Sequence, residues 1–341
     1  MVKNPSSYQS RFFEMVRTRV PDNEMLVDIL AELIDCSRDS AYRRIRGTTE
    51  LSVNDMVKIA KHFNISLNEW VGQSDSSVIF QSNSFIESLE GFRNHLLKSY
   101  GELERIAQFP KHQLIMQAKD VPYYYQFRSK KLAAFKVFVW LKSMYQLDQL
   151  EGLDFNVNSI PDDIIDLCLK IGEAYTKVNS IEIWNDDTML SMVKELEYYY
   201  EAGLLNSKEE ALELCQEMYA ISKVLYRQAL KGQKAHYSKS EEYGQGDYQM
   251  YFHEILVMDN HILAQLDENR KAYFIPFAGL NYLQSQDAGL SQKMENFLND
   301  QIKKSSLISN MSEKERNKFF IRIKNRIDQL KNKIEITNPF M

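Results

Sequence analysis

Cysteine, glycine and proline are scarce in this chain of 341 residues, which holds 3, 12 and 7 of them respectively. Cys36, Cys168 and Cys215 are odd in number and far apart, which excludes a disulfide framework and the close ligand spacing of a zinc site. Few glycines and prolines are typical of a mainly helical protein. We therefore predict a mainly α fold with no bound metal and no cofactor.

The sequence also lacks a long hydrophobic run and an apolar N-terminal leader. Its strongest apolar stretch, 133–141, is nine residues long and is interrupted by Lys136, whereas a membrane span needs about 20 residues. The first seven residues contain no apolar signal region. These features predict a soluble, cytoplasmic protein with no membrane partner.

Motifs of catalysis are missing as well. There is no phosphate-binding glycine loop, no Gly-x-Ser-x-Gly elbow and no dinucleotide fingerprint. His253-Glu254 begins like a zinc-protease motif, but Val257 stands where the second histidine is required. We therefore predict that the protein is not an enzyme. A catalytic C-terminal half with an unrecognised site is kept as an alternative.

An arginine-rich stretch at 37–47 stands out from this background. Four arginines fall within nine residues: Arg38, Arg43, Arg44 and Arg46. Ser37 suits a helix N-cap, and Gly47 suits a left-handed C-cap. At about 3.6 residues per turn, Ala41 and Ile45 share one face, which leaves the guanidinium groups on the other sides. Guanidinium matches the guanine edge and phosphate oxygens, although such a stretch is also typical of a solvated surface helix.

Helices predicted on both sides of this stretch complete a known order of elements. An apolar-periodic helix end at 30–36 runs directly into the N-cap, and an amphipathic helix at 52–64 follows. A capping box at 66–69 then leads to Trp70. This layout resembles the Cro/C1-type (XRE-like) helix-turn-helix family of transcriptional regulators over residues 10–72, about a fifth of the chain.

The resemblance implies a five-helix DNA-binding domain over residues 1–75 and double-stranded DNA as a partner. The positions that read bases in the family are here Arg38, Asp39 and Arg43. Arg43 is the best candidate for a bidentate guanine contact, while Asp39 would accept from a cytosine amine or support an arginine. Phosphate contacts, which position the domain without specifying a sequence, fall to Ser37, Arg44, Arg46 and Thr48.

This sequence departs from the family pattern at several positions. Asp35 and Asn64 stand where the family has glycine, so both are expected in the left-handed region. Arg44 replaces a bulky apolar residue, which predicts that Ile45 makes the core contact instead. Val27 replaces a polar residue that contacts phosphate in the family.

The distribution of charge predicts that a single copy binds DNA weakly. Residues 1–75 hold 10 basic and 11 acidic groups, a net charge of −1, and the whole chain carries −5. A nearly neutral domain must rely on the positive field of the recognition helix alone. We therefore predict a homodimer on a two-fold operator, with half-sites about one duplex turn apart.

Residues 76–110 are predicted to form a long helix that joins the two copies. Its apolar positions recur about every 3.5 residues, which is typical of a coiled-coil seam. The predicted seam consists of Phe85, Leu89, Phe92, Leu96, Leu103 and Ile106. A helix packed on its own chain is the alternative, and the helix predicted at 313–334 is a second candidate for the dimer interface.

The rest of the chain is predicted as a helical body over 111–240 and an α+β region over 241–341. Helices are expected at 132–147, 162–177, 188–202, 207–231, 292–306 and 313–334. Strands are expected at 248–258, 261–266 and 271–278, as a small three-stranded antiparallel meander in which Pro276 places the last strand at an edge. The tyrosines at 123–125 would either line an aromatic ligand pocket or pack in the core.

Two charged segments are expected to face water. The acidic stretch 182–187 is expected to be a loop before a helix N-terminus, and metal binding there is the alternative. The basic outer face of 313–334 is expected to face water, with DNA contact as the alternative. That predicted face consists of Lys314, Arg316, Lys318, Arg322, Lys324, Arg326, Lys331 and Lys333.

The leading hypothesis is thus a dimeric DNA-binding transcription regulator. Its C-terminal part would dimerise and, as an open extension, sense a small-molecule or peptide effector by shifting the spacing of two recognition helices. The alternatives are a protein-interaction or scaffold protein, and a peptide-sensing helical-repeat regulator, although no 34-residue period is found across 110–231. Guanidinium groups paired with carboxylates of the same chain would count against the leading hypothesis.

Overall fold

The computed structural model describes residues 8–20, 25–65, 70, 78–82, 85–236, 242–255, 259–267 and 270–337. The chain divides into two compact units, Met1–Ile79 and Phe80–Met341, here called the N-terminal unit and the C-terminal unit. The capping box predicted at 66–69 and the polar residues 72–77 of the sequence lie outside the described residues.

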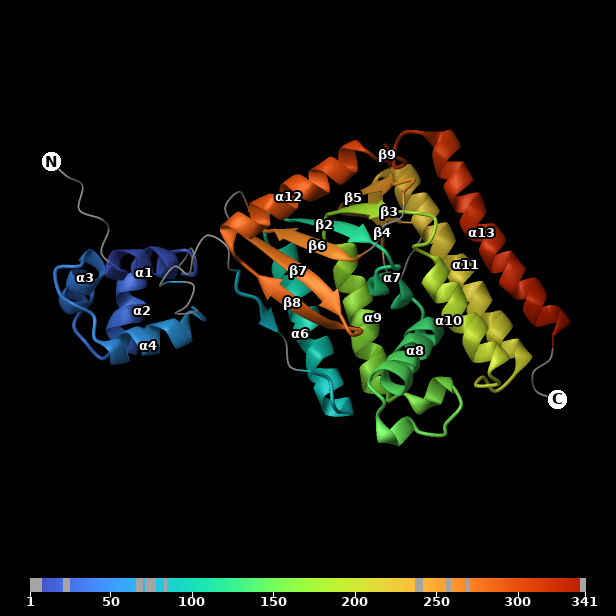
Figure 1. The fold of residues 1–341 in the computed structure, drawn as a ribbon, viewed down its shortest axis with the longest axis horizontal. Helices are drawn as coiled ribbons and strands as arrows, with labels where there is room; N and C mark the ends of the chain where they lie inside the picture. The colour runs from blue at the N-terminus through green and yellow to red at the C-terminus, as the bar shows by residue number, and fades with distance from the viewer. Residues whose placement is uncertain are drawn as a thin grey trace. The chain divides into compact units, whose positions relative to one another are not determined.

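The N-terminal unit is a small helical bundle (Figure 1). Its helices are α1 (Tyr8–Arg17), α2 (Leu26–Leu33), α3 (Arg38–Arg46) and α4 (Val53–His62). All four helices contribute to one core, which includes Phe12, Leu30, Ala41 and Ile59, each with no exposed surface. The Trp70 side chain packs against this core, and its indole nitrogen donates to the backbone oxygen of Tyr8 at 2.6 Å.

The C-terminal unit contains a nine-stranded mixed sheet among its described residues. Its strands are β1 (Gln81–Ser82), β2 (Gln113–Ala118), β3 (Ser180–Trp184), β4 (Gln233–Ala235), β5 (Tyr243–Phe252), β6 (His261–Gln265), β7 (Lys271–Phe277), β8 (Asn281–Ser285) and β9 (Ser306–Leu307). The spatial order is β1-β8-β7-β6-β2-β3-β5-β4, with β9 paired to β5. Strands β2, β3 and β5 run parallel, whereas β6, β7 and β8 form an antiparallel meander.

The predicted mainly α fold with a small three-stranded meander is therefore wrong, because this unit is a mixed α/β structure. Strands β2 and β3 fall inside the predicted helical body, and they are short and largely buried on both faces. Parallel strands buried on both faces show no polar alternation, which is the signal used to predict a strand. Strand β5, predicted as the first strand of the meander, instead pairs with β3.

The edge position predicted from Pro276 is also wrong. Strand β7 lies between β6 and β8. Its pairing with β6 ends at Phe274, which lies opposite Ile262. Pro276 therefore lies beyond the part of β7 that is hydrogen-bonded to β6. At Pro276 the strand is paired only with β8, where Tyr282 lies opposite, so the missing proline N–H costs no hydrogen bond to β6.

Helices cover both faces of the sheet. They are α6 (Leu89–Ala107), α7 (Tyr123–Gln126), α8 (Lys130–Val139), α9 (Asp162–Thr176), α10 (Leu190–Glu201), α11 (Lys208–Lys231), α12 (Ala288–Lys303) and α13 (Glu313–Ile336). The helices predicted at 132–147, 162–177, 188–202, 207–231, 292–306 and 313–334 are observed with slightly shifted ends. The helix predicted over 76–110 is wrong in its first part, because β1 lies inside that range and α6 begins only at Leu89. A π-helical turn, Trp140–Met144, extends α8, and two short 3-10 helices follow at Asp148–Leu150 and Val157–Ser159. Across the described residues, none of the helices combines the length and apolar character that crossing a bilayer requires.

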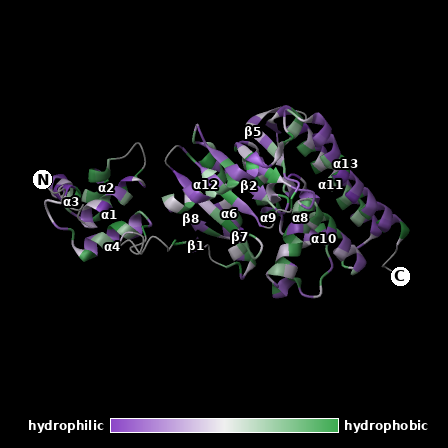
Figure 2. Ribbon diagram, turned by 45° about the horizontal axis from the view of Figure 1, so that its top comes forward, coloured by the Kyte–Doolittle hydropathy of each residue, from purple (hydrophilic) through white to green (hydrophobic). Residues whose placement is uncertain are grey.

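The sheet separates two hydrophobic cores. Helix α12 packs on one face through Leu298, against Ile115, Ile183 and Leu263 of the strands (Figure 1). The other face carries the main core, to which α6 to α11 and α13 contribute. Hydrophilic residues predominate on α3 of the N-terminal unit and on α13 of the C-terminal unit (Figure 2).

Candidate nucleic-acid interface

Helix α3 forms as the sequence predicts. The Ser37 hydroxyl accepts a hydrogen bond from the backbone nitrogen of Ser40 at 3.2 Å, and Gly47 ends the helix with a φ of 76°. Ala41 and Ile45 are buried, while Arg44 is only half-buried. The core contact is therefore made by Ile45, as predicted from the arginine at position 44.

The two turns predicted to replace family glycines are left-handed. Asp35 precedes α3 with a φ of 49°, and Asn64 follows α4 with a φ of 51°. Aspartate and asparagine visit this region more easily than most residues, yet both are less suited to it than glycine. The turns before α3 and after α4 are thus left-handed without a glycine.

Replacing Asp35 with glycine is expected to raise the free energy of unfolding of the N-terminal unit by up to about 1 kcal/mol, because a left-handed residue loses its steric cost. Urea denaturation followed by circular dichroism measures the change. Lys58→Gly, an exposed change inside α4, is the matched control and should destabilise by about 1 kcal/mol. Equal destabilisation by both changes would contradict a left-handed turn at Asp35.

The arginines predicted to read bases are paired within the chain. Arg38 lies 2.9 Å from a carboxylate oxygen of Asp28, and Arg43 lies 2.8 Å from a carboxylate oxygen of Asp39. Asp39 therefore supports an arginine here, one of the two roles predicted for it. The Arg38 and Arg43 side chains remain 68% and 62% exposed. This pairing is the observation that counts against the DNA-binding hypothesis, although exposed ion pairs of this kind contribute only about 0–1 kcal/mol to stability.

The residues predicted to contact phosphate differ from one another in their partners within the chain. Arg44 donates to the Ser40 hydroxyl, and the Arg46 guanidinium lies 4.9 Å from the centre of the Tyr42 ring. Thr48 donates its hydroxyl to the backbone oxygen of Arg43 at 3.0 Å. Arg46 and Thr48 are exposed, so both remain within reach of a phosphate backbone.

Gln9 of α1 is a positioning residue that sequence reasoning missed. Its amide nitrogen donates to the backbone oxygens of Arg44 at 2.7 Å and Thr49 at 2.8 Å, and its amide oxygen accepts from the nitrogen of Leu51 at 3.0 Å. One side chain thus fixes the end of α3 and the loop behind it. No local sequence signal links residues that lie 35 to 42 positions apart.

The predicted coiled-coil seam packs on its own chain. Phe92, Leu96, Leu103 and Ile106 of α6 are buried in the main core, where α6 contacts α9, and Leu89 packs against the same core. Phe85 precedes the helix and is 62% exposed. The alternative interpretation, a helix packed on its own chain, is therefore observed. Its buried side chains are not available for contact with a second copy.

The apolar row of α13, the second candidate dimer interface, is occupied in the same way. Phe320, Ile323, Ile327, Leu330 and Ile334 are buried in the main core, and α13 packs along α11 and α10. Neither helix presents its apolar row at the surface of the C-terminal unit.

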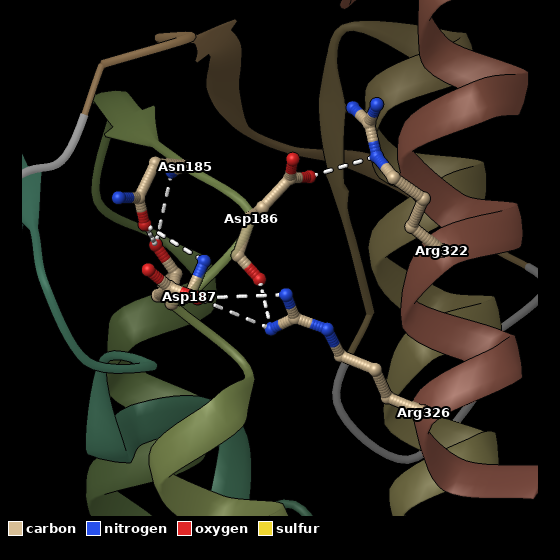
Figure 3. A network of polar contacts seen from close by, with 6 residues as sticks. Asn185, Asp186, Asp187, Arg322 and Arg326 are labelled. Atoms are coloured by element: carbon tan, nitrogen blue, oxygen red, sulfur yellow. Dashed lines mark hydrogen bonds and ion pairs between the residues drawn. The ribbon is translucent and has the colours of Figure 1, made fainter. Parts of the chain in front are cut away.

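The basic face of α13 meets the acidic residues after β3 (Figure 3). A nitrogen of Arg322 lies 2.8 Å from a carboxylate oxygen of Asp186, and Arg326 lies 3.4 Å from Asp187. Arg326 also donates to the backbone oxygen of Asp186. Arg316, predicted on this outer face, is instead buried. Charge balance within the chain thus accounts for much of this basic face.

Glu182, predicted in an acidic loop, lies inside strand β3 with no exposed surface. One carboxylate oxygen accepts from the hydroxyls of Tyr125 at 2.7 Å, Tyr175 at 2.6 Å and Ser180 at 3.0 Å. The other oxygen accepts from the indole nitrogen of Trp184 at 2.9 Å. Four donors therefore satisfy this carboxylate, which water does not reach.

A buried lysine completes this network. The Lys234 ammonium donates to the backbone oxygen of Tyr175 at 3.1 Å and lies 3.3 Å from the centre of the Tyr175 ring. Burial lowers the pKa of Lys234 to about 7, against the attraction of Glu182. Elsewhere in the described ranges, no three His, Cys, Asp or Glu side chains gather closely enough to hold a metal ion.

Comparison with known proteins adds no relative: no family model matches the chain, and neither a curated protein nor a solved structure shows significant similarity to it. The function therefore has to be inferred from the geometry of the chain itself.

Proposed function

We propose that this protein is a DNA-binding transcription regulator of the Cro/C1 (XRE-like) helix-turn-helix type, located in the cytoplasm. The observation that supports this most strongly is the arrangement of α3. Ala41 and Ile45 seat the helix on the core, while Arg38, Asp39 and Arg43 stay exposed on its outer sides. A protruding helix with guanidinium groups at its outer positions fits a major groove.

The proposed binding step exchanges partners at the surface of α3. Arg43 leaves Asp39 and donates to the O6 and N7 atoms of a guanine, and Arg38 leaves Asp28 for a base or a phosphate. Arg46 and Thr48 contact the backbone and fix the register. Because the N-terminal unit is almost neutral, two copies acting together supply the affinity.

Arg43→Ala is expected to weaken binding to the preferred duplex by about 1–3 kcal/mol, roughly 5- to 150-fold, and to relax the preference at one base pair. Arg46→Ala should weaken binding to all duplexes alike, because a phosphate contact carries no sequence information. Fluorescence anisotropy with duplexes varied at single positions measures both effects. Arg17→Ala, an exposed arginine at the end of α1, is the control. Parental affinity in both α3 variants would contradict these roles.

A protein-interaction or scaffold role is the second candidate function. It is favoured by one observation, that Arg38 and Arg43 are both paired within the chain. Salt dependence separates the two functions. A DNA-binding protein with 6–10 phosphate contacts should lose about 10³- to 10⁵-fold in affinity between 50 and 200 mM salt. Absence of duplex binding at about 50 mM salt would favour the scaffold role.

A further inference from the structure

The C-terminal unit contains a cavity of about 440 Å³ beside the carboxyl end of β2. It is partly open to solvent and is lined by residues of α6, α7, α8 with its π turn, α10 and the strands β2, β6, β7 and β8. Six aromatic side chains line it: Tyr123, Tyr124, Trp140, Phe274, Phe277 and Tyr282. Its volume lies within the range of about 300–1,000 Å³ that is typical of small-molecule sites. Two of the three tyrosines at 123–125 therefore line a pocket, while Tyr125 binds Glu182.

The charges around the cavity are unbalanced. Lys136 is neutralised because its ammonium lies 2.6 and 2.7 Å from the two carboxylate oxygens of Glu195. Glu102 pairs with Arg105 at 2.7 Å. Asp120 also lines the cavity, and no ion pair to it is found in the part of the chain that the structure describes. One lining carboxylate is thus left with its negative charge uncompensated.

Asp120 is held in place by Asn260, a neutral donor. The amide nitrogen of Asn260 donates to its carboxylate at 3.2 Å. The amide oxygen of Asn260 accepts from the backbone nitrogens of Lys119 at 2.9 Å and Asp120 at 3.3 Å. These contacts orient the carboxylate without neutralising it, which preserves its attraction for a cation.

We propose that this cavity binds a small organic cation, with an ammonium group against Asp120 and an apolar body between the aromatic rings. A carboxylate and an ammonium form a charge-assisted hydrogen bond, and the faces of aromatic rings attract a cation further. The site belongs to the C-terminal unit alone. Ligand binding there does not require DNA binding, so the two proposals fail independently.

Three probes with the same indole body test the charge preference: tryptamine carries an ammonium group, tryptophol a hydroxyl and indole-3-propionate a carboxylate. Isothermal titration calorimetry uses the full chain at pH 7 without DNA. Tryptamine should bind at least about 10-fold more tightly than tryptophol, a difference of about 1.4 kcal/mol, and indole-3-propionate should bind most weakly. No binding of tryptamine, or equal binding of all three probes, would overturn the proposal.

Asp120→Asn is expected to reduce tryptamine affinity about 10-fold, to the level of tryptophol, because the amide keeps the shape but loses the charge. Binding of tryptophol should be unchanged, which shows that the variant keeps a folded cavity. Asp148→Asn, an exposed change away from the cavity lining, should alter neither affinity. Unchanged tryptamine affinity in Asp120→Asn would overturn the assignment of this carboxylate.

Discussion

Replacing Glu182 with leucine is expected to lower the free energy of unfolding of the C-terminal unit by at least about 3–5 kcal/mol. The change removes the acceptor of four hydrogen bonds in a site with no exposed surface. Each buried donor left without a partner costs about 1–3 kcal/mol. Urea denaturation measures the loss. Trp184 is a direct probe because its indole loses a hydrogen bond to Glu182.

Two further variants separate the loss of the acceptor from the change in volume. Glu182→Gln keeps one acceptor oxygen but places an amide nitrogen among donors, so an intermediate loss of about 1–3 kcal/mol is expected. Glu173→Leu, an exposed change on α9, should remain within about 0.5 kcal/mol of the parent. A Glu182→Leu protein as stable as the Glu173→Leu protein would show that the carboxylate is not enclosed by these donors.

Lys234 is expected to contribute about 3 kcal/mol of additional stability to the C-terminal unit between pH 7 and pH 9.5, relative to a variant without its ammonium. Its pKa is about 7 in the folded chain, against an ordinary value of 10.5. Below pH 7 both states hold the proton, and the folded state carries the whole cost of a buried ammonium. As the pH rises, the folded state releases the proton before the unfolded state does, so that cost is removed.

Lys234→Met tests this dependence because it keeps an unbranched apolar stem without the charge. The variant should lose stability between pH 7 and 9.5, measured by urea denaturation at several pH values, because burial raises the pKa of the Cys168 and Cys215 thiols and only the unfolded state ionises them there. The difference in stability between the parent and the variant should rise by about 3 kcal/mol over the same range. The upper limit avoids the buried tyrosines, since burial raises the pKa of Tyr125, Tyr175 and Tyr248 above 10.0 and reverses the slope at higher pH. The same change of stability with pH in the parent and the variant would contradict a titrating Lys234.

Most of the helices were predictable because they carry their own local signals. Ser52 and Ser207 cap the helices that follow them, and Gly232 ends α11 in the left-handed conformation. Strand β3 was instead predicted to be part of a loop, because Glu182 lies close in sequence to the acidic residues Asp186 and Asp187. A carboxylate satisfied by donors far along the chain cannot be recognised locally. Tertiary contacts therefore decided this part of the fold.

Periodicity predicted an apolar face on α6 but not its partner. Phe92 and Leu96 would fit a coiled coil or the same chain equally well, and α9 is the partner observed. On α3, the Asp39–Arg43 pair follows from positions four residues apart on a helix. The Arg38–Asp28 pair requires α2 and α3 to be placed together, which the sequence alone does not give.

Selection of random duplexes with the full-length protein tests the DNA-binding proposal most directly. The account predicts enrichment of a two-fold symmetric site whose half-sites lie about one duplex turn apart, with a guanine preference that disappears in the Arg43→Ala protein. Recovered duplexes no different in sequence from the starting pool, at a salt concentration of about 50 mM, would contradict it.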